Sequence, residues 1–120
     1  MDIEWVRRHC MKLPHTTETV QWGTDLVFKI GGKMYAVVAT EPAPVCMSFK
    51  CSPEDFAELT ERPGVIPAPY LARAQWVALE SQEALPAAEI KRLLRKSYDL
   101  VLAKLPKKTQ AALNISITSR

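Results

Sequence analysis

The residue types that could carry out chemistry in this sequence are few, and their spacing does not match a catalytic arrangement. The two histidines are His9 and His15, and Cys10 directly follows His9. Neighbouring residues on a helix point about 100° apart, so His9 and Cys10 do not face each other as a Cys/His pair must. His15 lies in a predicted loop, where a solvated histidine is expected. No GxSxG sequence occurs, and Gly31-Gly32 is not part of a GxGxxG or GxxxxGKS sequence. We therefore expect a protein that is not an enzyme.

The cysteines do not indicate a metal site or a disulfide framework. There are three of them, at positions 10, 46 and 51, with no CxxC pair and no histidine at a zinc-ligand spacing. Reduced and partly buried thiols are expected instead. We predict no metal and no cofactor.

Basic residues gather near the carboxyl end of the chain. The net charge is only +3, but residues 85–108 hold seven Lys or Arg residues against Glu89 and Asp99. A stripe of cations on one side of a helix can contact the phosphates of nucleic acid, although such a side is often only the solvated side of a surface helix. The cations predicted to contact nucleic acid are four in the last helix and three on the predicted sheet: Lys91, Arg92, Arg95, Lys96, Lys29, Lys33 and Lys50.

A hairpin is predicted around Gly31-Gly32, because this dipeptide suits the positive φ angles of a two-residue turn. Side chains that pair across such a hairpin share a face of the sheet. The alternation assigns one set of residues to the core, namely Leu26, Phe28, Ile30, Tyr35 and Val37. It assigns another set to the outward face, where a protein partner or a second copy of the chain could bind: Val27, Met34, Ala36 and Val38.

Three helices are predicted from apolar spacing and capping residues. The first runs from the N-cap Asp2 to Pro14. The second opens at Ser52-Pro53 and ends before Pro63-Gly64. The third lies between Pro86 and Pro106 over about 20 residues, with its apolar residues on one side.

Strands are predicted between residues 19 and 50, and one more follows the second helix. The stretch "PAPYLARAQWVAL" at 67–79 begins with prolines that keep the chain extended and ends as a buried strand. We expect it to connect the second helix to the edge of the sheet. Trp76 in that strand and Tyr98 in the last helix are expected to lie together in the core.

The order of these elements is typical of an α+β fold, in which helices cover one face of an antiparallel sheet built from hairpins. The length of 120 residues, with 48% hydrophobic and 24% charged residues, fits a single domain over residues 1–120. The longest apolar runs are far shorter than a membrane span. The first residues include Asp2 and Glu4 and lack the cationic and apolar regions of a secretory signal, so a cytoplasmic protein is expected.

The sequence resembles the MmcQ/YjbR family of small bacterial proteins. The resemblance is carried by "VQWG", by "PGVIPAPYLARAQWVAL" and by "LPAAEIKRLLRKSYDLVLAKLPKK". It implies a CyaY-like fold, and members of the family are commonly labelled as DNA-binding proteins that use two wings. In this chain the wings would be the Gly31-Gly32 hairpin and the loop 41–44.

The fold name also includes iron-binding relatives of frataxin, whose first helix presents an acidic ridge. Here the first helix carries Arg7, Arg8 and Lys12, which would repel a cation, so iron binding is not expected. The leading functional prediction is weak, sequence-tolerant DNA binding. The alternative is a module for protein interaction or homodimerisation that uses the open face of the sheet.

Overall fold

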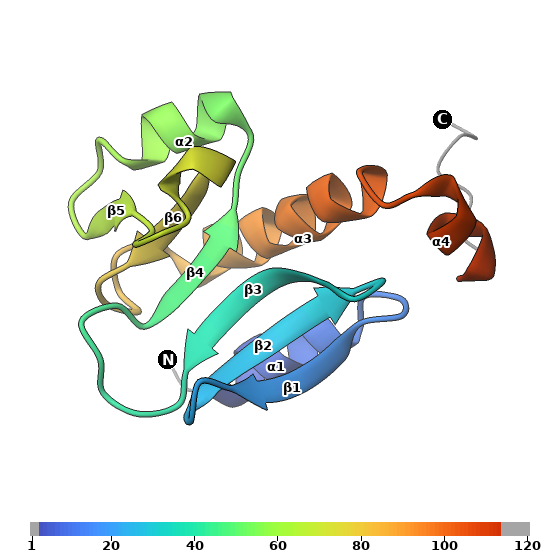
Figure 1. Cartoon of the computed structure of the whole chain (residues 1–120). Coiled ribbons are helices and arrows are strands. Elements are labelled where there is room, and N and C mark those ends of the chain that lie inside the picture. The colour runs from blue at the N-terminus through green and yellow to red at the C-terminus, as the bar shows by residue number, and fades with distance from the viewer. Residues whose placement is uncertain (1–2, 114–120) are drawn as a thin grey trace.

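Over residues 3–113, the part of the chain that it describes, the computed structural model has six strands in one antiparallel sheet (Figure 1). The strands are β1 Thr17–Gln21, β2 Asp25–Ile30, β3 Lys33–Ala39, β4 Met47–Lys50, β5 Val65–Pro67 and β6 Trp76–Leu79. The helices are α1 Ile3–Met11, α2 Pro53–Leu59, α3 Ala87–Ala103 and α4 Lys107–Ala112, with a 3-10 turn η1 at Ala72–Ala74. The order across the sheet is β1-β2-β3-β4-β6-β5. The predicted N-cap Asp2 lies outside the described residues.

The helices pack on one face of this sheet, which confirms the predicted α+β fold. We call the face covered by α3 the inner face and the opposite one the outer face. Side chains from α1, α2 and α3 form the main core with the inner face, including Val6, Leu59 and Leu94. A smaller cluster of Ala68, Trp76 and Ala78 lies on the outer face. No helix among residues 3–113 is long and apolar enough to cross a bilayer.

Helix α3 follows the predicted pattern closely. Its buried residues are Ile90, Leu93, Leu94, Ser97, Tyr98, Val101 and Leu102, and they recur at spacings of three and four. The helix begins directly after Pro86 and is 17 residues long, slightly shorter than predicted. Tyr98 donates a hydrogen bond to the Pro14 carbonyl at 2.6 Å, and its ring meets that of Tyr35 edge to face at 5.4 Å between centroids.

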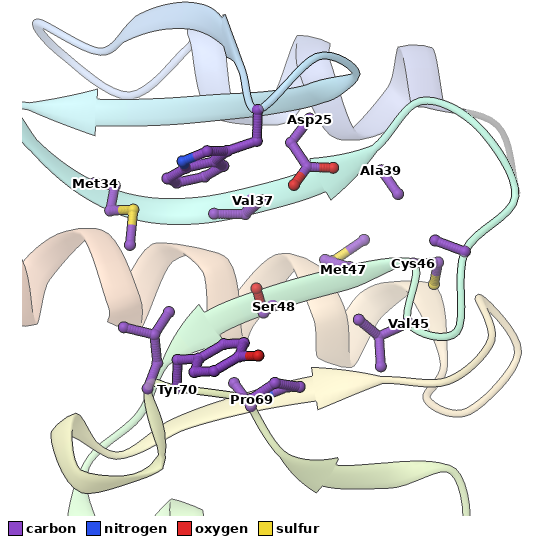
Figure 2. A pocket seen from close by; sticks show the side chains of 14 residues that line it. Asp25, Met34, Val37, Ala39, Val45, Cys46, Met47, Ser48, Pro69 and Tyr70 are labelled. Carbon is purple, nitrogen blue, oxygen red and sulfur yellow. The ribbon is translucent and has the colours of Figure 1, made fainter.

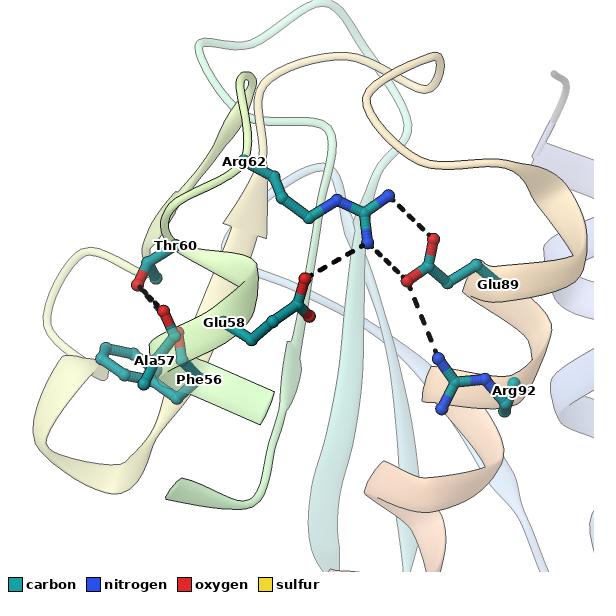
Figure 3. Close-up of polar contacts among 7 residues, drawn as sticks. All are labelled: Phe56, Ala57, Glu58, Thr60, Arg62, Glu89 and Arg92. Carbon is teal, nitrogen blue, oxygen red and sulfur yellow. Dashed lines mark hydrogen bonds and ion pairs between the residues drawn. The ribbon is translucent and has the colours of Figure 1, made fainter. Parts of the chain in front are cut away.

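Helix α2 begins as predicted and is fixed to α3 by an ion-pair cluster. Ser52 Oγ accepts a hydrogen bond from the Asp55 backbone N–H at 3.1 Å, which caps the helix. Just beyond the helix, both terminal nitrogens of Arg62 donate to the Glu89 carboxylate of α3, at 2.6 and 3.0 Å (Figure 3). Glu58 lies 3.8 Å from Arg62, and Arg92 lies 3.7 Å from Glu89. The cluster therefore joins two segments that are far apart in the sequence.

A β-bulge in β3 changes which residues face the core. Lys29 pairs with Met34 but Phe28 pairs with Ala36, so Tyr35 is an extra residue with no partner on β2. Tyr35 and Ala36 both point to the inner face, and the alternation beyond them is reversed. The prediction for the end of β3 was therefore wrong: Ala36 and Val38 lie in the main core, whereas Val37 packs with the outer cluster.

The bulge also interrupts the pairing of β3 with β4, and a side chain of α3 replaces the missing contacts. Pairing between these strands covers only Ala36 to Val38 on β3. Beyond it, the Ser97 hydroxyl donates to the Tyr35 carbonyl at 2.6 Å and accepts from the Lys50 backbone N–H at 3.0 Å. Ser97 is fully buried, so its side chain satisfies two strand groups that would otherwise lack partners.

The segment after α2 contributes more to the sheet than predicted. Residues Val65–Pro67 form the edge strand β5, and β6 lies between β5 and β4 rather than at the edge. Pro67 is compatible with this position, because an edge strand has no partner for one of its sides. Trp76 is buried as predicted, but on the outer face, so it does not join the strand to α3 and Tyr98. Its neighbours Val77 and Leu79 face the helices instead.

Candidate functional site

An apolar groove of about 560 Å³ runs along the outer face of the sheet, and we call it the outer groove. Its lining comes from the β1–β2 turn, from β2, β3 and β4, and from the loop between β3 and β4. Residues 68–71, which lie before η1 and which we call the connector, complete the lining. The lining residues are Trp22, Asp25, Met34, Val37, Ala39, Ala43, Val45, Cys46, Met47, Ser48, Ala68, Pro69, Tyr70 and Leu71. Figure 2 shows Asp25 and Val37 on one side of the groove, with Pro69 and Tyr70 on the other.

The floor of the groove follows from the bulge. In a regular strand Met34 and Val37 would lie on opposite faces of the sheet. Because Tyr35 is an extra residue, both point to the outer face. Ser48 pairs with Val37 across β3 and β4, so it lies on the same face. An apolar floor results where a sheet exposed to water would carry polar residues.

Two loops from opposite sides of the sheet each supply an exposed aromatic residue. Trp22 is in the turn between β1 and β2 and has 65% of its surface exposed, while Tyr70 in the connector is fully exposed. Both residues have positive φ angles, 52° for Trp22 and 67° for Tyr70. A large side chain rarely adopts this left-handed conformation, which costs about 1 to 2 kcal/mol per residue. Two strained and exposed aromatic residues therefore lie at one groove.

Asp25 is the one acidic residue of the groove lining, and the lining contains no Lys, Arg or His. Its side chain is partly buried at the start of β2, next to the turn that holds Trp22. Within residues 3–113, no basic side chain forms an ion pair with Asp25. The groove thus combines an apolar floor with one carboxylate that no basic side chain of the described residues neutralises.

The four basic residues predicted on α3 are engaged in contacts within the protein. Lys96 Nζ lies 2.6 Å from Asp55, and Arg95 Nε lies 3.3 Å from Asp99. Arg92 contacts Glu89 as described, and the Lys91 ammonium lies over the Trp5 ring at 5.4 Å from its centroid. The side chains of Arg92 and Arg95 remain more than half exposed. The acids beside them reduce the positive potential that the sequence predicted for this side.

The three sheet lysines do not gather into one patch with them. Lys50 Nζ donates to the Ala74 carbonyl at 2.6 Å, and partial burial lowers the pKa of this amine. Lys29 lies on the outer face beside Met34, and Lys33 is exposed at the start of β3. These positions place Lys29 and Lys33 near the hairpin turn, while Lys50 is held against the connector.

The Gly31-Gly32 hairpin is not a free wing. A Cβ atom built on Gly31 would lie 2.6 Å from a methyl carbon of Leu105 and 3.1 Å from that of Thr109. The turn therefore packs against the segment that joins α3 to α4. The double-wing arrangement implied by the family resemblance keeps only the loop 41–44 as an exposed wing, and this loop has no basic residue.

The predicted partner face, Val27, Met34, Ala36 and Val38, is not a continuous exposed surface. Ala36 and Val38 belong to the main core because of the bulge, and Val27, although on the outer face, has no exposed surface. Met34 is the one member of that set that lines the outer groove.

The cysteines and His9 are buried to an extent that disfavours a catalytic role. Burial raises the pKa of both the Cys10 and the Cys51 thiol to about 12, so neither is a thiolate at neutral pH. Burial also raises the pKa of Cys46 and lowers that of His9, whose Nε2 lies 3.0 Å from the Lys91 carbonyl. Among residues 3–113, no group of three His, Cys, Asp or Glu side chains is placed to hold a metal ion.

Of the lining residues, the sequence predicted only Met34 for a binding face, and the three that distinguish the groove chemically, Trp22, Asp25 and Tyr70, were not predicted. A signal for two of them was present. Trp22 stands directly before Gly23, and Tyr70 follows Pro67 and Pro69, so both aromatic residues occupy loop positions where a core role is not expected. Nothing in the sequence pattern indicated that the two loops line the same groove.

Comparisons with known proteins agree with this fold. The YjbR family model matches residues 11–100. The crystal structure of a Deinococcus radiodurans protein with a DUF419 domain is similar, with a TM-score of 0.83 and 32% sequence identity, covering 95% of this chain and 88% of that one. The crystal structure of a Pseudomonas syringae protein has a TM-score of 0.69 and 23% identity, covering 83% of this chain and 98% of that one, and supports the fold alone. A comparison with curated proteins gave no significant match.

The family model spans α3 almost to its end, together with all six strands. The Deinococcus radiodurans structure extends the likeness to nearly the full chain. Both results agree with the resemblance carried by the connector and by the last helix. The chain belongs to the YjbR family.

Proposed function

We propose that the protein is a binding protein without catalytic activity, and that its ligand occupies the outer groove. The observation that carries this proposal is the pair of exposed, left-handed aromatic residues, Trp22 and Tyr70, beside an apolar floor. Strained backbone persists where the surrounding structure or a function retains it, and such positions cluster at ligand sites. The Tyr70 side chain is fully exposed, so packing of this side chain in the core does not account for its conformation.

The size and chemistry of the groove fit a small organic molecule. Binding sites for such ligands are mostly apolar clefts of roughly 300 to 1,000 Å³ with a few polar groups that fix orientation. The groove has a volume of about 560 Å³, and its polar side chains include Asp25 and Ser48. Trp and Tyr rings supply contact area at a low cost in conformational entropy.

A homodimer that closes over this face is less well supported. Two copies related by a twofold axis would each bring Asp25 to the contact, and the groove lining offers no cation to pair with it. A carboxylate that is buried without a partner costs several kcal/mol. If sedimentation shows a dimer that Met34→Glu dissociates, this argument fails and the groove is an interface between copies.

The test of the proposed function is the affinity of the groove for a neutral amphiphile. We expect 4-phenyl-1-butanol to bind saturably in NMR titrations, since its ring can contact Trp22 and Tyr70. Trp22→Ala combined with Tyr70→Ala should weaken binding by roughly tenfold, because each aromatic contact contributes about 0.5 to 1.5 kcal/mol. Met11→Ala removes an exposed apolar residue on α1 and is the matched control. Equal affinity of the double variant and the wild type would exclude the groove as the site.

DNA binding is a second candidate, favoured by the exposure of Arg92 and Arg95 on the basic side of α3. Phosphate contacts release counterions, so the logarithm of the affinity should fall with that of the salt concentration, with a slope of about 1 per contact. We expect Arg92→Gln with Arg95→Gln to flatten that slope if this side binds duplex DNA. Lys107→Gln with Lys108→Gln is the matched control for net charge. Equal slopes for both double variants would remove α3 as the contact.

A further inference from the structure

The charge of the outer groove points to the chemical class of its ligand. We infer that the groove binds a small organic cation, in which an apolar body carries one ammonium group, and this inference rests on the proposed function of the groove. The ammonium lies at Asp25 and the apolar body lies on the floor formed by Met34 and Val37. The carboxylate, the aromatic rings and the absence of basic side chains from the groove lining favour this class of ligand.

Asp25 is held in the groove without an ion-pair partner among residues 3–113. It is the first residue of β2, and its backbone pairs with Gln21 of β1 and Ala39 of β3, so its side chain is presented from a rigid part of the sheet. Figure 2 shows its carboxylate among the side chains that line the groove. A ligand that buries this partly covered carboxylate has to compensate its charge, because the lining offers apolar groups and no basic side chain.

The cations of the outer face are not placed to neutralise Asp25. Lys29 is on the same strand but four residues farther along, which is about 13 Å at the rise of a β-strand. The Lys50 amine donates a hydrogen bond to the carbonyl of Ala74, the last residue of η1. Arg73 lies within η1 and does not line the groove. Among residues 3–113 no basic side chain forms an ion pair with Asp25, so its carboxylate is available to a bound cation.

The aromatic residues strengthen the preference for a cation. The faces of Trp and Tyr rings carry negative potential and attract an ammonium group within about 6 Å of the ring centre. Trp22 is separated from Asp25 by only two residues of a tight turn, so both residues enter the groove lining from the same turn. Phosphate and carboxylate ligands are disfavoured there, because Asp25 would repel them and no basic residue of the lining would bind them.

A matched series of ligands tests the inference in solution. The three probes share one apolar body and differ only in charge: 4-phenylbutylammonium, 4-phenyl-1-butanol and 4-phenylbutyrate. We expect the ammonium to bind roughly tenfold more tightly than the alcohol and the carboxylate to bind most weakly, in line with the size of exposed ion-pair and cation–π contributions. Asp25→Asn should remove most of the advantage of the ammonium over the alcohol, leaving only the cation–π part, and should leave the affinity for the alcohol unchanged. Glu61→Gln removes one exposed acid just beyond α2, outside the groove lining, and is the control for net charge.

The outcomes separate this inference from the proposed function. Equal affinities of the wild type for all three probes, or an ammonium advantage that is as large in Asp25→Asn as in the wild type and in Glu61→Gln, would overturn the inference while the groove remains a binding site. Binding of none of the probes would overturn both. The unfolding midpoint of Asp25→Asn verifies that the variant is folded, and if it is not, Asp25→Ser provides a second neutral variant. The inference is supported if folded Asp25→Asn loses most of the ammonium advantage and Glu61→Gln keeps it.

Discussion

Ser97 is fully buried on α3, where its hydroxyl donates to the Tyr35 carbonyl and accepts from the Lys50 N–H. These backbone groups belong to β3 and β4, which form the floor of the outer groove. Removal of the hydroxyl would leave a buried acceptor and a buried donor without partners. The shape of the groove therefore depends on a side chain that lies on the opposite face of the sheet.

We expect Ser97→Ala to lower the free energy of unfolding by about 2 to 4 kcal/mol, because each buried group left unsatisfied costs about 1 to 3 kcal/mol. Urea denaturation measures the change. Ser48→Ala is the control, since Ser48 is on β4 and has no side-chain hydrogen bond among the described residues, and it should stay within about 0.5 kcal/mol of the wild type. A Ser97→Ala variant as stable as the control would show that water replaces the hydroxyl.

A substitution at Tyr70 tests whether this residue contributes to ligand binding and not to the stability of the fold. Asn adopts positive φ angles more readily than Tyr, and the Tyr70 side chain is fully exposed. Tyr70→Asn should therefore keep or slightly raise the melting temperature while it weakens the binding of 4-phenyl-1-butanol. A fall of the melting temperature by several degrees would show that Tyr70 has a structural role instead.

The hairpin between β2 and β3 packs on the joint between α3 and α4, and its two glycines differ in their surroundings. Both have positive φ angles, 59° for Gly31 and 81° for Gly32, so both alanine substitutions strain the backbone. A Cβ at Gly31 meets Leu105 and Thr109, whereas one at Gly32 has no atom of the described chain within 4 Å. Gly31→Ala should thus be less stable than Gly32→Ala by about 1 kcal/mol, from overpacking alone. Equal stabilities would mean that the hairpin is free to move as a wing.

The ion pair between Arg62 and Glu89 joins α2 to α3 and should make stability depend on pH. Hydrogen bonds from Arg62 hold the pKa of Glu89 below its usual value of 4.5. A carboxyl with a lowered pKa in the folded state stabilises the protein above the unfolded pKa, and the contribution is lost as the pH falls through the folded pKa. Arg62→Gln should be less stable than the wild type at pH 7, and the difference should shrink below pH 4.5. A difference that is constant from pH 7 to pH 3 would contradict this assignment.

Much of the fold could be predicted from the sequence because its signals are local. The cap at Ser52 and the apolar spacing of α3 depend on residues within a few turns of each other, and both predictions were confirmed. The facing of β3 could not be predicted, since the extra residue Tyr35 leaves no mark in the alternation of an apolar strand. Trp76 was misplaced for a related reason: all four residues of β6 are buried, so the strand has no polar side that would indicate its orientation.

The candidate site was harder to predict than the fold. The basic residues of α3 were visible in the sequence, but the acids that pair with them come partly from other elements, as Asp55 does for Lys96. The outer groove is formed where the turn holding Trp22 and the connector holding Tyr70 meet the same sheet face. Their meeting follows from the strand order, which places β1 and β2 on one side of β3 and β4, and β6 and β5 on the other.

The two faces of the sheet differ in how far they are covered. The inner face of the sheet is filled by the helices, whereas the outer face is covered only in part, by the connector and η1 (Figure 1). The uncovered part is the outer groove, and its apolar floor, two aromatic residues and one carboxylate are the features that a ligand would meet. The central claim is that this groove binds small organic cations.

Methyl NMR of the methionines tests this claim most directly. Met34 lines the outer groove, and Met11 is an exposed methionine on α1, which packs on the inner face, so one sample contains a reporter and its control. In a titration with 4-phenylbutylammonium, we predict saturable shifts of the Met34 methyl signal and none of the Met11 signal, since an aromatic ring placed over the floor shifts nearby methyl resonances. Saturable binding that leaves the Met34 signal unmoved, or no binding at all, would contradict the claim.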